Sequence, residues 1–208
     1  MPAAEEGLQA TIIKLEVENA DVIIERAADG KLSVTDLTNS EEVTYSQQVA
    51  DDQLTIRSKG RYDEVEHAGT IEIYLPDDCR LSCELTSGTL KMTGVRCTSV
   101  RAELMSGDIR LNDVTMTSGK LSTMSGDVFL TGRVDSGKVD LSSISGNVRL
   151  TLPGNPDTKL DLSSETGEVW FNVRQIGVSM NKTLGKGRGR ITATSISGDV
   201  EYRTAKTN

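Results

Sequence analysis

Short runs of alternating apolar and polar residues recur along the chain, and many of them follow a Ser-Gly or Thr-Gly pair. Alternation with a period of two is typical of a β-strand that is buried on one side. The glycines of these pairs are Gly88, Gly107, Gly126, Gly146, Gly167 and Gly198, at spacings of 19, 19, 20, 21 and 31 residues. A near-constant period of this size indicates a solenoid in which each repeat is one coil.

Each coil contains a second strand before its glycine turn, as in RAEL from Arg101 and KVDL from Lys138. Two short strands per coil, with no helical spacing between them, predict an all-β fold. The predicted architecture is a flattened, single-stranded parallel β-helix, or β-solenoid, with 19–21 residues per coil. The handedness of parallel crossovers favours right-handed winding.

Stacking the coils about 4.8 Å apart predicts which side chains become neighbours. One inward ladder consists of Leu90, Ile109, Val128, Val148, Val169 and Val200. A second inward ladder consists of Met92, Leu111, Leu130, Leu150, Phe171 and Tyr202. The residues between them form an outward ladder of Lys91, Arg110, Phe129, Arg149, Trp170 and Glu201.

Residues 10–75 also alternate, as in TIEIYLP, but their turns are irregularly spaced. We interpret them as irregular N-terminal coils and as the cap that protects the open edge of a solenoid. No linker separates them from the regular coils at 76–203, so we predict one domain over 10–203. Residues 1–9 are then disordered or a leader, and residues 204–208 are a tail.

The recurring SGD turn has two interpretations. Glycine supplies the positive φ of a coil corner, and Ser and Asp can bond nearby backbone groups. Alternatively, a ladder of oxygen ligands could bind calcium; its members would be Asp108, Asp127, Asn147, Glu168 and Asp199. The geometric interpretation is favoured, because Thr89 interrupts the ladder and the period is not that of calcium-binding nonapeptide repeats. We expect neither a metal nor a cofactor.

Composition and charge narrow the possible functions. One Trp, four Tyr and two Phe stand against 19 Gly, which suits a thin core of aliphatic residues around many turns. A net charge of −8 argues against nucleic-acid binding, which depends on Lys and Arg. No apolar run approaches the roughly 20 residues of a membrane span. The first nine residues show no secretory signal.

Two of the three cysteines, Cys79 and Cys83, alternate with Leu81 and Leu85 and so share their strand face. Buried free thiols are the favoured interpretation, and a disulfide or metal site is the alternative.

The stretch TIEIYLPDDCRLSCELTSGTLKMTG, followed by SGDIRL, SGDVFL, SGNVRL and SGDV, resembles the bacterial candidate-adhesin domain of unknown function, also described as the toastrack domain. The resemblance covers roughly residues 10–203. It implies a β-solenoid without known enzymatic activity, usually attached to an envelope protein and linked to adhesion or envelope-stress sensing. It supplies no catalytic residues.

Catalytic motifs are weak. His67, the single histidine, lies in DEVEHAG without a recognisable nucleophile beside it, and we interpret it as a solvated loop residue. The segment GVSMNKT, 177–183, lacks the glycine before the lysine that a phosphate-binding loop has. We therefore predict that the protein is not an enzyme.

A basic segment stands out against the acidic total. Residues 169–198 contain no Asp or Glu, and the long gap between Gly167 and Gly198 includes RQIGVSMNKTLGKGRGR. We predict a flexible loop that binds an anionic partner through Arg174, Lys182, Lys186, Arg188 and Arg190. A second candidate surface on the outward ladder consists of Phe129, Arg149 and Trp170, with Arg149 stacked on one or both rings.

Three functions remain open at this point. The first is a non-catalytic binding or adhesion module of the envelope, with stress sensing as one form of it. Its partner would be an anionic polymer, lipid headgroups or another envelope protein. The second is a scaffold that assembles end to end, because DVEYR ends the repeats with no visible cap. A carbohydrate-active enzyme is the third and weakest. If an N-terminal anchor was removed, we expect an extracytoplasmic or cell-surface location, and otherwise a cytoplasmic one.

Overall fold

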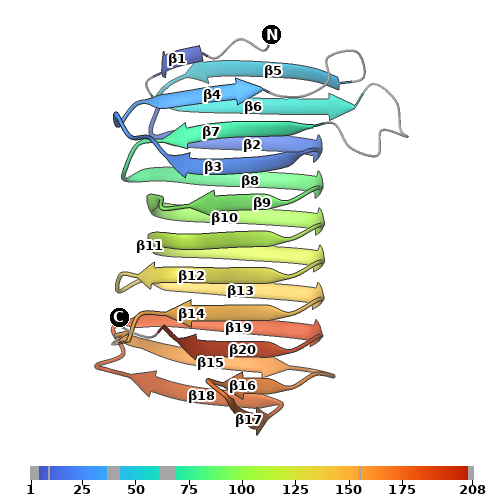
Figure 1. Cartoon of the computed structure of the whole chain (residues 1–208), viewed down its shortest axis with the longest axis vertical. Helices are drawn as coiled ribbons and strands as arrows, with labels where there is room; N and C mark the ends of the chain where they lie inside the picture. Colours follow the sequence, from blue (N-terminus) through green and yellow to red (C-terminus); the bar gives the residue numbers. More distant parts are fainter. Residues whose placement is uncertain (1–4, 9, 37–42, 61–68, 155, 206–208) are drawn as a thin grey trace.

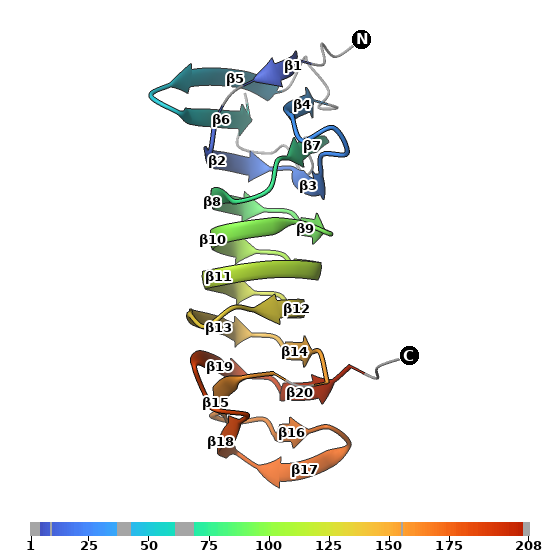
Figure 2. The ribbon, with the colours of Figure 1, turned by 90° about the vertical axis from the view of Figure 1, so that its left-hand side faces the viewer.

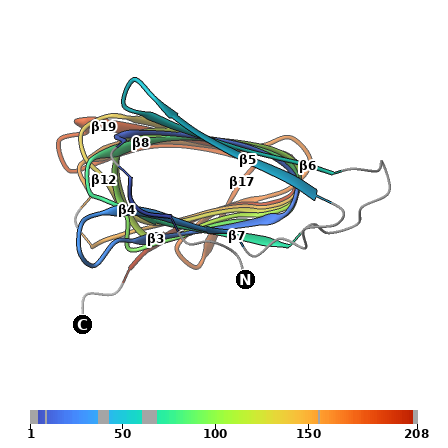
Figure 3. The same ribbon diagram turned by 90° about the horizontal axis from the view of Figure 1, so that it is seen from above.

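The computed structural model describes residues 5–8, 10–36, 43–60, 69–154 and 156–205. Its strands form a flattened tube with two long walls (Figure 1, Figure 3). In stack order the first wall contains β5 (Val43–Ala50), β6 (Gln53–Gly60), β2 (Ile12–Asn19), β8 (Cys79–Ser87), β10 (Arg96–Ser106), the second half of β11 (Ile109–Ser125), β13 (Lys138–Ser145), β19 (Gly189–Ser197), β15 (Thr158–Ser164) and β18 (Ser179–Leu184).

The second wall contains β1 (Glu5–Leu8), β4 (Leu32–Asp36), β7 (Thr70–Leu75), β3 (Asp21–Arg26), β9 (Leu90–Thr93), the first half of β11, β12 (Val128–Val134), β14 (Val148–Leu152), β20 (Val200–Thr204), β16 (Val169–Phe171) and β17 (Arg174–Gly177). Strands of neighbouring regular coils pair in parallel, which confirms the predicted solenoid. Its handedness stays a prediction.

The predicted inward ladders form the core. Every member of the ladder from Leu90 to Val200 is buried. In the second ladder only Phe171 is partly exposed, since it lies near the end of the stack. Period-two alternation therefore identified the core face correctly in the regular coils.

The glycine corner depends on direct contact between backbones. A Cβ atom at Gly107 would lie 1.9 Å from the carbonyl oxygen of Gly88, and one at Gly126 would lie 2.2 Å from that of Gly107. Gly146 continues the series at 2.0 Å from Gly126. A side chain at this corner would force the coils apart, so glycine is required here by contact as well as by its positive φ.

The Asp or Asn after Gly107, Gly126, Gly146 and Gly198 joins one coil to the next. Asp108 Oδ1 accepts a hydrogen bond of 2.8 Å from the amide of Asp127, and Asp127 Oδ1 one of 2.7 Å from the amide of Asn147. Asn147 and Asp199 extend this ladder to the amides of Asp199 and Glu168. The oxygen ladder of the sequence is thus a ladder of bonds between side chains and backbone amides.

A buried row of hydroxyl groups runs beside the same corner. Thr123, Ser143 and Ser195 are each 3% exposed, and they donate to the carbonyls of Gly107, Gly126 and Gly146 respectively. Ser164 does the same for Gly198. Because a buried carbonyl without a partner is costly, these hydroxyls stabilise the corner where the glycines meet.

The C-terminal coils do not stack in sequence order. β19 pairs with both β13 and β15, and β20 with both β14 and β16. Residues 189–204 therefore form a coil between those of 138–152 and 158–171 (Figure 2). The predicted ladder order is wrong here, since Val200 lies between Val148 and Val169. The strands of every regular coil offer the same backbone hydrogen-bonding groups to a neighbouring coil. The repeat sequence therefore does not specify which coil stacks on which.

The N-terminal coils are interleaved in the same way. β2 pairs with both β6 and β8, and β3 with both β7 and β9. Residues 12–26 thus lie between the coil that contains β6 and β7 and the first regular coil.

Antiparallel strands close both ends of the stack. β5 pairs with β6, while β1 and β4 extend from β7 on the other wall. At the opposite end, β18 pairs with β15 and β17 with β16. The expectation that the last strand leaves an uncovered parallel edge is wrong, because β20 has a neighbour on each side.

Cys79, Cys83 and Cys97 are buried free thiols, as the favoured interpretation of the sequence predicted. In the described ranges, no helix has the length and apolarity that a membrane span requires. His67 lies outside the described residues.

Candidate functional site

The basic segment forms a structured cap instead of the predicted flexible loop. We call residues 172–188 the C-terminal cap; it contains β17, β18 and the turn that leads into β19 (Figure 1). In the turn, Gly185 and Gly187 have φ of +61° and +66°, in the left-handed region that glycine adopts readily. The amide of Gly189 donates to the carbonyl of Asp157 at 2.9 Å. The turn is thereby attached to the preceding coil.

Two of the predicted anion-binding cations already have carboxylate partners. Arg188 Nε lies 2.5 Å from Asp157 Oδ2, and Arg190 Nη2 lies 2.6 Å from Asp161 Oδ2. The Arg188 guanidinium holds the pKa of the Asp157 carboxyl below its ordinary value. Both carboxylates come from residues before the segment 169–198, which itself contains no acid. Counting charges within that segment alone therefore overestimated the number of cations without a carboxylate partner.

The other three cations are exposed on the cap. Lys182 lies over the ring of Phe171, with Nζ 4.0 Å from the ring centroid. Phe171 in turn stacks on Tyr202 with 4.9 Å between centroids. Within the described part of the chain, no carboxylate pairs with Arg174, Lys182 or Lys186. These three remain available to an external anion.

Exposed apolar side chains accompany these cations. Val173 is 94% exposed, Val178 58% and Ile176 43%. The sequence interpretation missed them, because it considered only the charge of the segment. The sequence does contain a sign of them. Three β-branched residues lie among polar and charged residues in a gap that is longer than one coil, so part of this gap must lie outside the core. The cap thus combines free cations with exposed apolar surface. Its strands β17 and β18 lie at one end of the molecule (Figure 2).

The second candidate surface lies on the second wall, around Phe129 and Arg149. Phe129 lies between two guanidinium groups, those of Arg110 at 5.1 Å and Arg149 at 5.3 Å from the ring centroid. Arg149 also pairs with Glu201 at 2.7 Å. Glu201 separates Arg149 from Trp170 in the stack, so of the two arrangements expected from the sequence Arg149 adopts the one in which it stacks on a single ring, that of Phe129.

Glu201 connects two cations on this wall. Burial raises the pKa of its carboxyl, but the hydrogen bonds from Arg203 and Arg149 outweigh burial and lower the pKa overall. Trp170, Arg149 and Glu201 line a small hollow of about 230 Å³. Since Arg149 and Phe129 are engaged by their neighbours, this wall offers less free binding capacity than the cap.

Comparison with known proteins places the fold. The family model described as Toastrack DUF4097 matches residues 79–203, which confirms the resemblance drawn from the sequence. The structure of a candidate cell adhesion protein from Clostridium sporogenes aligns with a TM-score of 0.51 at 16% identity, covering 99% of this chain and 100% of that one. A candidate adhesin from Bacteroides fragilis aligns with a TM-score of 0.48 at 13% identity, covering 99% and 96% of the two chains. No curated protein sequence matches the chain.

Proposed function

Because the chain belongs to the Toastrack DUF4097 family, we propose that it is a non-catalytic binding module of the cell envelope, whose C-terminal cap attaches to an anionic membrane surface. The observation that carries the proposal is the presence of Arg174, Lys182 and Lys186 together with three exposed apolar side chains on one cap. The description of the Clostridium sporogenes protein as a candidate cell adhesion protein is in keeping with this role.

The physical argument has an electrostatic and an apolar part. Each Lys or Arg near an anionic leaflet contributes about 1 kcal/mol, and apolar side chains beside them can enter the interface. With a net charge of −8 for the whole chain and +5 for residues 169–198, the other 178 residues carry −13. The rest of the molecule is therefore repelled by the same surface. The protein would bind with its cap toward the lipids and its N-terminal end away from them.

Sedimentation with vesicles tests this proposal. We expect the protein to bind vesicles containing phosphatidylserine and not vesicles of phosphatidylcholine alone, with binding that weakens as salt is added. Replacing Arg174, Lys182 and Lys186 with Gln should weaken binding at least about tenfold. A matched control replaces Arg80, Lys91 and Arg96 with Gln, since these are exposed cations on middle coils.

A third variant separates the two parts of the argument. Changing Val173, Ile176 and Val178 to Ser retains every charge of the cap but removes the apolar surface, so binding should weaken while its salt dependence persists. Absence of binding to anionic vesicles in the parent protein, or equal losses in the cap and control variants, would show that the cap is not a membrane site.

End-to-end assembly is less well supported than it was from sequence alone. Both ends of the stack carry antiparallel strands, so the parallel pairing of the coils cannot continue from one molecule into the next. We infer an extracytoplasmic or cell-surface location from the description of the Clostridium sporogenes protein as a candidate cell adhesion protein. Attachment at the cap would leave the walls free for a further partner.

A further inference from the structure

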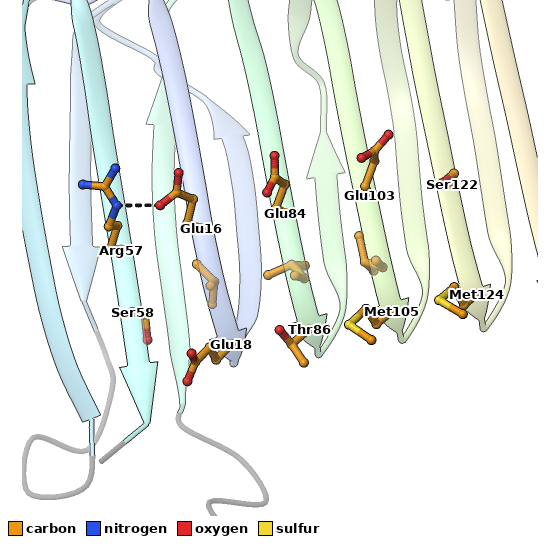
Figure 4. A pocket seen from close by; sticks show the side chains of 13 residues that line it. Glu16, Glu18, Arg57, Ser58, Glu84, Thr86, Glu103, Met105, Ser122 and Met124 are labelled. Atoms are coloured by element: carbon orange, nitrogen blue, oxygen red, sulfur yellow. Dashed lines mark hydrogen bonds and ion pairs between the residues drawn. The ribbon is translucent and has the colours of Figure 1, made fainter. Parts of the chain in front are cut away.

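Two rows of side chains run side by side along the first wall, near the glycine corner (Figure 4). The acidic row consists of Glu16, Glu84 and Glu103, which are in register on β2, β8 and β10. The edge row contains Met105 and Met124, which are 58% and 52% exposed. It continues along the next coils with Ile144 and Ile196, which are 46% and 43% exposed.

A groove of about 640 Å³ lies between the acidic row and the methionines of the edge row, over β6, β2, β8, β10 and β11. Its floor includes Val17, Leu85 and Leu104, whose side chains are almost wholly buried. Its walls are the acidic row and the methionines, so a ligand would meet carboxylates on one side and apolar sulfur-containing side chains on the other. Methionine is flexible and polarisable, and it adapts well to apolar partners.

In the part of the chain that the structure describes, two of the three carboxylates in the acidic row form ion pairs, and the third does not. Glu16 pairs with Arg57 at 2.5 Å, and Glu103 pairs with Lys120 at 2.6 Å. Among the described residues, no side chain pairs with Glu84, which lies between these two. The groove thus has an unneutralised carboxylate at its centre.

One buried polar group in the groove also lacks a partner. Ser58 is 3% exposed and lines the groove beside Val17, and its Oγ has no hydrogen-bond partner in the described structure. A buried hydroxyl without a partner is unfavourable. Ser58 follows the outward-facing Arg57 and pairs with the buried Val17, so its hydroxyl lies on the core side of the groove floor. A ligand in the groove would contact the carboxylates and the methionines instead.

We propose that this groove binds a cationic amphipathic helix, laid along the axis of the solenoid. A helix presents one apolar position per turn of 5.4 Å, and the coils repeat at about 4.8 Å. Over three coil spacings, roughly 14 Å, the two repeats differ by about 2 Å, which flexible methionine side chains can absorb. One apolar residue per turn then meets the edge row, while Lys or Arg on the adjacent helix face meets Glu84 and its neighbours.

Fluorescence anisotropy with a labelled 14-residue Leu/Lys peptide tests the proposal. The binding peptide has Leu at helical spacing i, i+3, i+4, i+7, and the control peptide has the same composition in an order without an apolar face. We expect the amphipathic peptide to bind at least about tenfold more tightly than the control, because only it can bury a continuous stripe.

Variants of the protein locate the site. Met105→Ser with Met124→Ser should weaken binding of the amphipathic peptide about tenfold, and Glu84→Gln should weaken it about threefold. Matched controls are Val49→Ser and Glu25→Gln, which change exposed residues of the same kinds outside the groove. Circular dichroism and the thermal midpoint should be unchanged in all of these variants, since the altered side chains are at the surface.

Several results would overturn the proposal. The two peptides could bind equally, or the control variants could weaken binding as much as the groove variants. The parent protein could also self-associate in sedimentation velocity and lose that association in the Met105→Ser, Met124→Ser variant. The occupant would then be a second copy of the chain. Vesicle binding through the C-terminal cap should be the same in every groove variant, so the two proposals fail separately.

Discussion

The Sγ atoms of Cys79 and Cys97 lie 3.3 Å apart, in register on β8 and β10. The two thiols form a hydrogen bond between adjacent coils, inside the core. This bond and burial raise the pKa of Cys97, and burial raises the pKa of Cys83. Because the thiolate is the reactive form, Cys83 and Cys97 are protected by chemistry as well as by packing. The same hydrogen bond lowers the pKa of Cys79, so this thiol is protected by burial alone.

We therefore predict that alkylation of all three thiols requires unfolding. Iodoacetamide should label none of the three cysteines of the native protein at neutral pH and all three in denaturant, as counted by intact mass spectrometry. Labelling of the native protein at the rate of an exposed peptide thiol would contradict the buried arrangement.

Gly107→Ala should destabilise the protein by about 3 kcal/mol or more. The new Cβ would lie 1.9 Å from the Gly88 carbonyl oxygen at a φ of +126°, so backbone strain adds to a direct clash. Gly30→Ala is the matched control, because Gly30 also has a positive φ but no atom within 4 Å of the new Cβ. It should cost only about 1 kcal/mol. Chemical denaturation of both variants measures the difference, and equal losses would show that contact between coils is unimportant.

Asp127→Ala should cost about 1 kcal/mol, because the amide of Asn147 loses its acceptor from the preceding coil. Asp127→Asn keeps an oxygen in the same place and should remain within about 0.5 kcal/mol of the parent protein. Thermal unfolding with calcium or with a chelator distinguishes this from a metal ladder. A midpoint that rises with calcium and does so less in Asp127→Asn would favour metal binding instead.

The pH dependence of stability should include a contribution from Glu201. Its pKa in the folded protein lies below the ordinary value of 4.5, so its ion pairs stabilise the fold above that pH and are lost as pH falls through the lowered pKa. Glu201→Gln should cost about 1 kcal/mol at pH 7. The difference from the parent protein should shrink as pH falls below 4.5. Denaturation curves at pH 7, 5, 4 and 3 measure it, and a difference that grows on acidification would contradict the assignment.

The sequence was sufficient to predict the structure of a single coil, but not the order in which the coils stack. Alternation and the glycine period predicted the parallel walls, the corner and the buried ladders, because these depend on residues within one repeat. The position of Val200 between Val148 and Val169 depends on which coil edges pair. Those edges share glycine corners, Asp or Asn acceptors and aliphatic ladders, so several orders satisfy the same local pattern.

The candidate site was predicted in part for a similar reason. Charge counting found the cap, but the partners of Arg188 and Arg190 are Asp157 and Asp161, which the fold brings from the preceding coil. The groove on the first wall was missed entirely. Its Glu84 and Met105 are ordinary members of their repeats, and only stacking places them in one groove.

The interleaved coil at 189–204 has a consequence for biosynthesis. Residues 158–171 leave the ribosome before residues 189–204, although they must pack on them in the finished protein. Until residues 189–204 have emerged, β13 and β14 lack the neighbours β19 and β20 on one side. The coil of β15 and β16 lacks the same two strands, which are its partners in the finished stack. The nascent chain cannot complete the stack by adding coils one after another as they emerge. Its final third must close as a unit, with residues 189–204 inserted between two coils made earlier.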